Sequence, residues 1–113
     1  MEYWHNPRCS KSREALALLE QHGVRPTIRD YLKEPPSADE ISAVISRLRL
    51  GSARDLMRTK EAVYKELDLK SVEDEAALVQ AMADNPKLIE RPILIHGERA
   101  AIGRPVENIL EAV

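Results

Sequence analysis

The alternation of apolar and polar positions predicts strands at both ends of the chain and helices between them. Tyr3-Trp4 is a short apolar strand candidate that stops before Pro7. Residues 15–19 then carry alanine and leucine at the i, i+3, i+4 spacing of a helix face, and Gly23 is placed to end that helix. The β-favouring stretch from Thr27 to Leu32 predicts a second strand, which completes a strand-helix-strand unit.

The middle of the chain has the pattern of helices alone. Ser37 and Glu40 form a capping box after Pro35-Pro36, and a helical stripe follows with Ile41, Val44, Ile45 and Leu48. Ser71 with Asp74 is a weaker capping pattern before a helix that stops near Asn85-Pro86. Residues 37–85 are therefore predicted to be an all-helical insertion.

The last part of the chain returns to strands. Ile93-Leu94-Ile95 and Ala100 to Ile102 flank a turn candidate and predict an antiparallel hairpin, and a final helix begins near Pro105. The order is βαβ, a helical insertion, then ββα. It predicts an α/β fold with a thioredoxin-like mixed four-stranded sheet, formed by residues 1–113 as a single domain.

Composition narrows the function classes. The 113 residues include 17 Lys and Arg against 19 Asp and Glu, a net charge of −2, so no basic field attracts nucleic acid or an anionic membrane surface. No signal-peptide pattern opens the chain, and one unpaired cysteine fits a reducing compartment. We expect a cytoplasmic monomer whose partners are small molecules or proteins rather than nucleic acid or membrane.

The only cysteine, Cys9, stands where the first strand gives way to the first helix. Unpaired N–H groups and the positive end of the helix dipole favour a thiolate there, and Arg8, Lys11 and Arg13 add positive charge. The alternative is a small buried hydrophobic residue, but Cys9 has polar or charged neighbours on both sides. The sequence therefore favours a reactive cysteine.

The residues around Cys9 limit the chemistry. Ser12 occupies the position of a resolving cysteine, so no internal disulfide can form and any redox cycle needs an external thiol. A phosphatase-type loop would need an arginine where Ala15 stands. The three histidines lack metal-ligand spacing, so no metal site is predicted.

The segment from His5 to Arg13, with sequence His-Asn-Pro-Arg-Cys-Ser-Lys-Ser-Arg, resembles the active-site segment of the glutaredoxin-coupled arsenate reductase family of the ArsC type. The likeness covers nearly the whole chain and continues through four further motifs: Tyr31-Leu32-Lys33-Glu34-Pro35-Pro36, Leu56-Met57-Arg58, Leu88-Ile89-Glu90-Arg91-Pro92-Ile93 and Gly103-Arg104-Pro105. One difference from the family is a shorter first strand. A second is Arg8 with Ser10-Lys11-Ser12; these residues match a subgroup of the family whose substrate is less settled than its fold.

The resemblance implies a mechanism and a set of site residues. Cys9 would be the nucleophile that forms a covalent thiol-arsenate adduct, with His5 favouring the thiolate and Ser12 hydrogen-bonding it. The oxyanion would be held by Arg58, Arg91 and Arg104, because guanidinium groups bind tetrahedral oxyanions with paired, charge-assisted hydrogen bonds. Glutathione would be the co-substrate and glutaredoxin the protein partner, with no bound cofactor. Thioredoxin-like folds also imply a cis peptide bond before Pro92.

Simpler roles remain open for each of these residues. Arg58 could cap a short helix, Arg91 could be solvated, and Arg104 could pair with Glu107. His5 and Ser12 could do no more than satisfy the turn.

Two other functions fit the same fold: a glutathione-dependent thiol transferase whose arginines bind carboxylates, and an Spx-type regulator that binds RNA polymerase. The regulator typically carries a Cys-x-x-Cys switch, which Ser12 removes here.

Overall fold

The computed structural model describes all residues from Met1 to Val113. The chain divides into two compact units, one made of Met1–Glu34 with Arg91–Val113 and the other of the continuous segment Pro35–Glu90. The first unit contains every strand, and the second contains helices and turns with one isolated antiparallel bridge between Met57 and Ile89. No helix of the structure has both the length and the apolar composition that a bilayer crossing requires.

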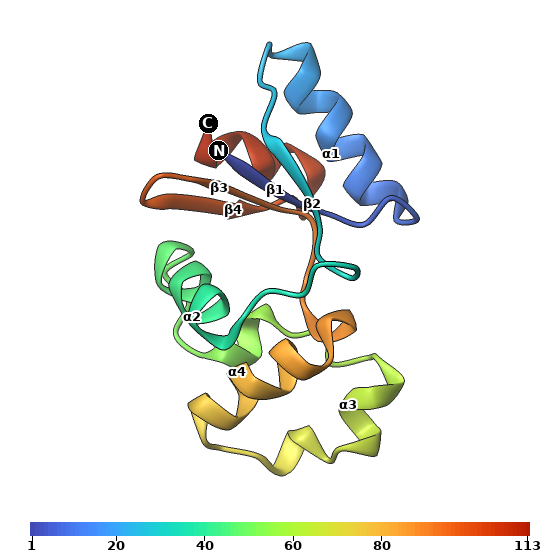
Figure 1. The fold of residues 1–113 in the computed structure, drawn as a ribbon, viewed down its shortest axis with the longest axis vertical. Coiled ribbons are helices and arrows are strands. Elements are labelled where there is room, and N and C mark those ends of the chain that lie inside the picture. Colours follow the sequence, from blue (N-terminus) through green and yellow to red (C-terminus); the bar gives the residue numbers. More distant parts are fainter. The chain divides into compact units, whose positions relative to one another are not determined.

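The first unit is a four-stranded mixed sheet with helical cover (Figure 1). Its strands lie in the order β2-β1-β3-β4, with β1 parallel to β2 and antiparallel to β3, and β3 antiparallel to β4. The bounds of its elements are β1 Glu2–His5, α1 Ser10–Gln21, β2 Thr27–Asp30, β3 Ile93–His96, β4 Arg99–Ile102 and the 3₁₀ helix η4 Val106–Ala112. This is the predicted thioredoxin-like sheet.

One face of this sheet forms the core of the first unit. Tyr3, Leu94 and Ala101 are cross-strand neighbours, so their side chains lie on the same face. α1 and η4 pack against that face with Ala15, Leu19, Ile109 and Ala112. Burial of these apolar groups fixes α1 on the sheet, and the start of α1 is therefore held beside the end of β1.

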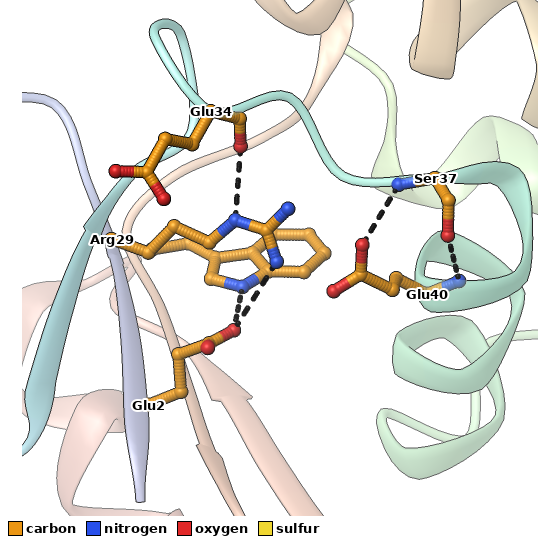
Figure 2. A network of polar contacts seen from close by, with 6 residues as sticks. Glu2, Arg29, Glu34, Ser37 and Glu40 are labelled. Atoms are coloured by element: carbon orange, nitrogen blue, oxygen red, sulfur yellow. Dashed lines mark hydrogen bonds and ion pairs between the residues drawn. The ribbon is translucent and has the colours of Figure 1, made fainter.

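The other face of β1 carries the buried Trp4, whose polar neighbours Glu2 and Arg29 are labelled in Figure 2. Trp4 is 1% exposed, and its Nε1 donates to Glu2 at 2.7 Å. The guanidinium of Arg29 lies 5.8 Å from the Trp4 ring centroid, its Nη1 is 3.7 Å from the Glu2 carboxylate, and its Nε donates to the Glu34 carbonyl. The indole thereby gains a partner for its N–H and a cation over its ring.

The second unit is helical, as the apolar stripes predict. Its elements are α2 Ala38–Arg47, η1 Ala53–Leu56, α3 Ala62–Glu66, η2 Leu69–Ser71, α4 Glu75–Asp84 and η3 Pro86–Leu88. The capping box at Ser37 is present, because Ser37 Oγ accepts from the Glu40 N–H and Glu40 accepts from the Ser37 N–H (Figure 2). Within this unit Arg54 connects distant turns by donating to Tyr64 and to the carbonyls of Leu69 and Val72.

Two local predictions need correction. Ser71 does not start the helix that precedes Asn85: it ends η2 and donates to Asp68, while α4 begins at Glu75 after Asp74. Ser71 instead closes a local turn, since the left-handed backbone of Asp68, with φ 48°, redirects the chain just before it. The final helix is a 3₁₀ helix rather than an α-helix.

Candidate active site

The turn between β1 and α1 holds Cys9 at the N-cap position. The Asn6 carbonyl accepts the Cys9 N–H at 3.0 Å, and Asn6 Oδ1 accepts the Arg8 N–H at 3.0 Å. Cys9 has an extended backbone, and α1 starts at the next residue. The thiol is half-buried, so it is close to the unpaired N–H groups of the helix and still accessible.

Ser12 connects the first turn of α1 to β1. Its Oγ lies 2.7 Å from His5 Nδ1 and accepts the Asn6 N–H at 3.0 Å, and its carbonyl accepts the Tyr3 hydroxyl at 2.6 Å. Ser12 and Tyr3 are both fully buried. This network sets the direction of the helix start, and with it the direction of the N–H groups near Cys9.

Two arginines from the far end of the chain belong to the same site. Arg104 Nη2 lies 4.0 Å from Cys9 Sγ, and Arg104 Nε donates to the Arg91 carbonyl at 2.8 Å. The charge of Arg91 also acts on the Cys9 thiol. The peptide bonds that follow both arginines, to Pro92 and to Pro105, are cis. The first of these was predicted and the second was not.

Gly103 allows the chain to bring Arg104 to this position. A Cβ added to Gly103 would lie 2.8 Å from Pro92 Cγ and 3.4 Å from Ala15 Cβ, which is too close to a proline ring that cannot move aside. The Gly103 N–H also donates to the Pro92 carbonyl at 2.9 Å. The absence of a side chain therefore lets the backbone just before Arg104 lie against Pro92 and Ala15.

The surroundings of Cys9 favour its thiolate. Partial burial acts to raise the pKa of the thiol, but the Ser12 N–H, the positive charge and side chain of Arg91, and the Lys11 N–H together outweigh burial. The net result is a pKa below the ordinary value for a thiol. Anions are stabilised by a helix N-terminus, and the first turn of α1 contains no acidic residue to compete for it.

His5 and Tyr3 remain uncharged near neutral pH. Burial lowers the pKa of His5, Asp30 acts in the opposite direction, and Arg13 lowers it further. Burial raises the pKa of Tyr3 to about 12, against the effect of its hydrogen bond to Ser12. The imidazole lies 2.7 Å from Ser12 Oγ, and the role of His5 in favouring the Cys9 thiolate stays a prediction.

The structure brings together five of the six predicted site residues, and they all lie in the first unit: Cys9, His5, Ser12, Arg91 and Arg104. Arg58 belongs to the second unit, where its Nη1 pairs with the Glu61 carboxylate at 2.5 Å and its N–H donates to the Leu88 carbonyl. Its role in binding an oxyanion stays a prediction.

Tyr3 and Gly103 are not among the site residues predicted from the sequence. A signal for Tyr3 was present, because side chains two apart on a strand share a face and Tyr3 is two residues before His5. Gly103 stands in the Gly103-Arg104-Pro105 motif, but its role depends on a contact with Pro92 that only the folded chain creates.

Three features define a thioredoxin-like thiol protein. They are a mixed four-stranded sheet, a lone cysteine at the N-cap of its first helix and a cis-proline before β3. A thiolate beside guanidinium groups can attack a tetrahedral oxyanion that those groups hold. The chain belongs to the ArsC family, whose sequence model matches residues 4–112.

Individual relatives agree with this assignment. The chain is 52% identical to "Uncharacterized protein YfgD" of Escherichia coli K12 over 114 aligned positions, covering 100% of this chain and 96% of the relative. It is 49% identical to an arsenate reductase of Neisseria meningitidis, covering 100% and 97%. The structure of an arsenate reductase from Vibrio cholerae superimposes with a TM-score of 0.95 at 47% identity, covering 100% of this chain and 98% of that one.

Proposed function

We propose that this protein is an arsenate reductase that uses Cys9 as its nucleophile. The observation that carries the proposal is the contact of Arg104 with a thiol whose pKa is already lowered by Arg91 and by the start of α1. The family membership and the similarity to proteins named arsenate reductase support the same substrate.

In the first step the Cys9 thiolate attacks arsenic. A sulfur-arsenic bond forms, one arsenic-oxygen bond breaks, and the departing oxygen leaves as water after protonation; arsenic remains As(V). Arg91 and Arg104 hold the remaining oxygens and offset their charge, which orients arsenic towards the sulfur. Arg58 would complete the guanidinium set.

Reduction then needs two thiols from outside the chain, because Cys9 has no partner cysteine. Glutathione displaces a second arsenic oxygen as water and forms its own sulfur–arsenic bond. The glutaredoxin thiolate then attacks the glutathione sulfur, so that this bond breaks, a mixed disulfide forms and the electron pair left on arsenic reduces As(V) to As(III). Water finally breaks the Cys9–arsenic bond and arsenite leaves. In sum two thiols are oxidised to one disulfide, As(V) becomes As(III), and one arsenate oxygen is released as water. Cys9 returns as a thiolate for the next cycle.

The test is arsenate-dependent oxidation of glutathione in the presence of glutaredoxin, with arsenite measured directly as the product. Turnover that is lost in Cys9→Ser is the expected result. Intact-protein mass spectrometry of the arsenate-treated protein should detect the arsenate adduct on Cys9 in the absence of thiols. Arsenite formation by Cys9→Ser at the rate of the unmodified protein would contradict the proposal.

The same preparation separates the rival functions. A thiol transferase would reduce a glutathione mixed disulfide through Cys9 and leave arsenate unchanged. A regulator of the Spx type would be retained by immobilised RNA polymerase and would show neither activity. Either pattern would replace the arsenate reductase proposal.

A further inference from the structure

A hollow of about 350 Å³ lies beside the turn that carries Cys9. This volume is in the range of small-molecule binding sites. Its walls come from the turn itself and from the end of β2 with the residues that follow: Asn6, Pro7, Arg8, Asp30, Leu32 and Lys33. The lining does not include Arg91 or Arg104, the two arginines near the Cys9 thiol.

We propose that this hollow binds the thiol co-substrate, a tripeptide-sized thiol with two carboxylates and one ammonium group, of which glutathione is the expected example. The inference rests on the proposed function, because it assigns a place to the reductant of that reaction. The two reactants then bind at separate places: Arg91 and Arg104 bind the oxyanion, and the hollow binds the thiol.

The charges of the hollow match those of such a thiol. Arg8 and Lys33 are exposed cations that complement two carboxylates, and the half-buried Asp30 complements an ammonium group. A bare oxyanion would gain from the two cations but would be repelled by Asp30. The hollow therefore favours a zwitterionic ligand with a net negative charge over arsenate itself.

The backbone of the hollow and the side chains of Asn6 and Asp30 are held in place before any ligand arrives. Asn6 Oδ1 accepts the Arg8 N–H at 3.0 Å, Asp30 Oδ1 accepts the Leu32 N–H at 3.1 Å, and the Lys33 N–H donates to the Asp30 carbonyl at 3.0 Å. A fixed backbone reduces the ordering cost of binding. Leu32 adds a partly exposed apolar surface for the methylene groups of the ligand.

The hollow is coupled to the nucleophile through one turn. Asn6 lines the hollow, and its carbonyl accepts the N–H of Cys9 at 3.0 Å. A thiol bound between this turn and the end of β2 is held next to the residue whose adduct it must attack, which raises its effective concentration there.

The first experiment measures equilibrium binding of S-methylglutathione, which cannot react, by calorimetry and by NMR shifts. Arg8→Glu and Lys33→Glu are each expected to raise the Kd by about threefold and the double variant by about tenfold. Lys87→Glu is the matched control, because it makes the same charge change at an exposed site of the second unit and should leave the Kd unaltered. An unaltered Kd in the double variant would overturn the proposal.

The second experiment is kinetic and uses the complete glutaredoxin-coupled assay. Lys33→Glu, which leaves the positive charge of Arg8 beside Cys9 in place, should raise the KM for glutathione by about threefold while the KM for arsenate stays within about twofold. With 2-mercaptoethanol, which has no carboxylate, the variant and the unmodified protein should have equal rates. A KM change for arsenate alone would assign Lys33 to the oxyanion and overturn the proposal.

The two proposals fail in different ways. If S-methylglutathione binds in the hollow but arsenate is not reduced, the thiol site stands and the arsenate reductase function is wrong. If arsenate is reduced through Cys9 but the double variant binds S-methylglutathione like the unmodified protein, the function stands and the thiol site is wrong.

Discussion

The N-termini of α1 and α2 differ in how they are capped. Both helices present unpaired backbone N–H groups in their first turn. In α2 the Glu40 N–H is satisfied by Ser37 in a reciprocal capping box, and Asp39 and Glu40 are first-turn acids. α1 has a cysteine at the N-cap, no side-chain capping bond and no first-turn acid.

α1 therefore lacks a stabilising side-chain cap at the position of its reactive cysteine. The capping box occupies the Ser37 and Glu40 N–H groups and places carboxylates at the start of α2, whereas the start of α1 lends its partial positive charge to the Cys9 thiolate. The first turn of α1 is stabilised by other means, through the buried Ser12 and its bonds to Tyr3, His5 and Asn6.

Replacing the N-cap cysteine of α1 with serine, the N-cap residue of α2, should have the largest effect on activity. Cys9→Ser removes the nucleophile, so we expect arsenate reduction to fall by at least about a thousandfold. Serine is a preferred N-cap residue, so stability should stay unchanged or rise by up to about 1 kcal/mol. Steady-state assays and urea unfolding measure the two effects. A stability loss together with retained activity would show that the cysteine is structural.

The next largest effect on activity is expected at Arg104, whose Nη2 lies 4.0 Å from Cys9 Sγ at the start of α1. Arg104→Lys keeps the charge but loses the planar pair of donors, and its Nε bond to the Arg91 carbonyl is lost with it. We expect kcat/KM for arsenate to fall by about tenfold with little change in the Cys9 alkylation rate. An unaltered kcat/KM would remove Arg104 from the oxyanion site.

Gly103→Ala tests the close packing that delivers Arg104. The added methyl group meets the Pro92 ring, so we expect a loss of about 1–3 kcal/mol in the free energy of unfolding. Gly51→Ala is the matched control, because the nearest atom to its new Cβ is the Asp55 carboxylate at 4.0 Å. Chemical unfolding of both variants checks the comparison, and equal stabilities would contradict the packing argument.

The smallest effect on activity is expected at the closed helix start. Ser37→Ala breaks the capping box and should lower the free energy of unfolding by about 1 kcal/mol. Arsenate reduction by the folded protein should be unaltered. Thermal unfolding and the coupled assay, run at a temperature where both proteins are folded, test this. A large loss of activity would mean that the start of α2 takes part in the reaction.

Local signals explain why the sequence predicted so much of this fold. The stripe in residues 15–19 and Gly23 give the correct helix, and Gly23 has the positive φ, 73°, that ends it. The Ser37 and Glu40 capping box is readable because its partners are three residues apart. Ser71 and Asp74 have the same spacing but form no cap, since a turn at Asp68 uses the serine.

The site was less predictable because its parts come from distant segments. Cys9 at a helix start follows from local sequence, whereas the arginines were found through resemblance to a family. Nothing local shows that Arg104 reaches a sulfur 95 residues earlier in the chain. The contact of Gly103 with Pro92 depends on how β4 leaves the sheet, which is a property of the whole first unit.

The most direct test of the account is the pH dependence of Cys9 alkylation by iodoacetamide, measured for the unmodified protein and for Arg91→Met. Thiolate is the reactive form, so the rate should fall only when the pH drops below the lowered pKa of Cys9. The account predicts a midpoint below that of an ordinary thiol, and a higher midpoint once the charge of Arg91 is removed. A midpoint at or above the ordinary value, unmoved in Arg91→Met, would contradict it.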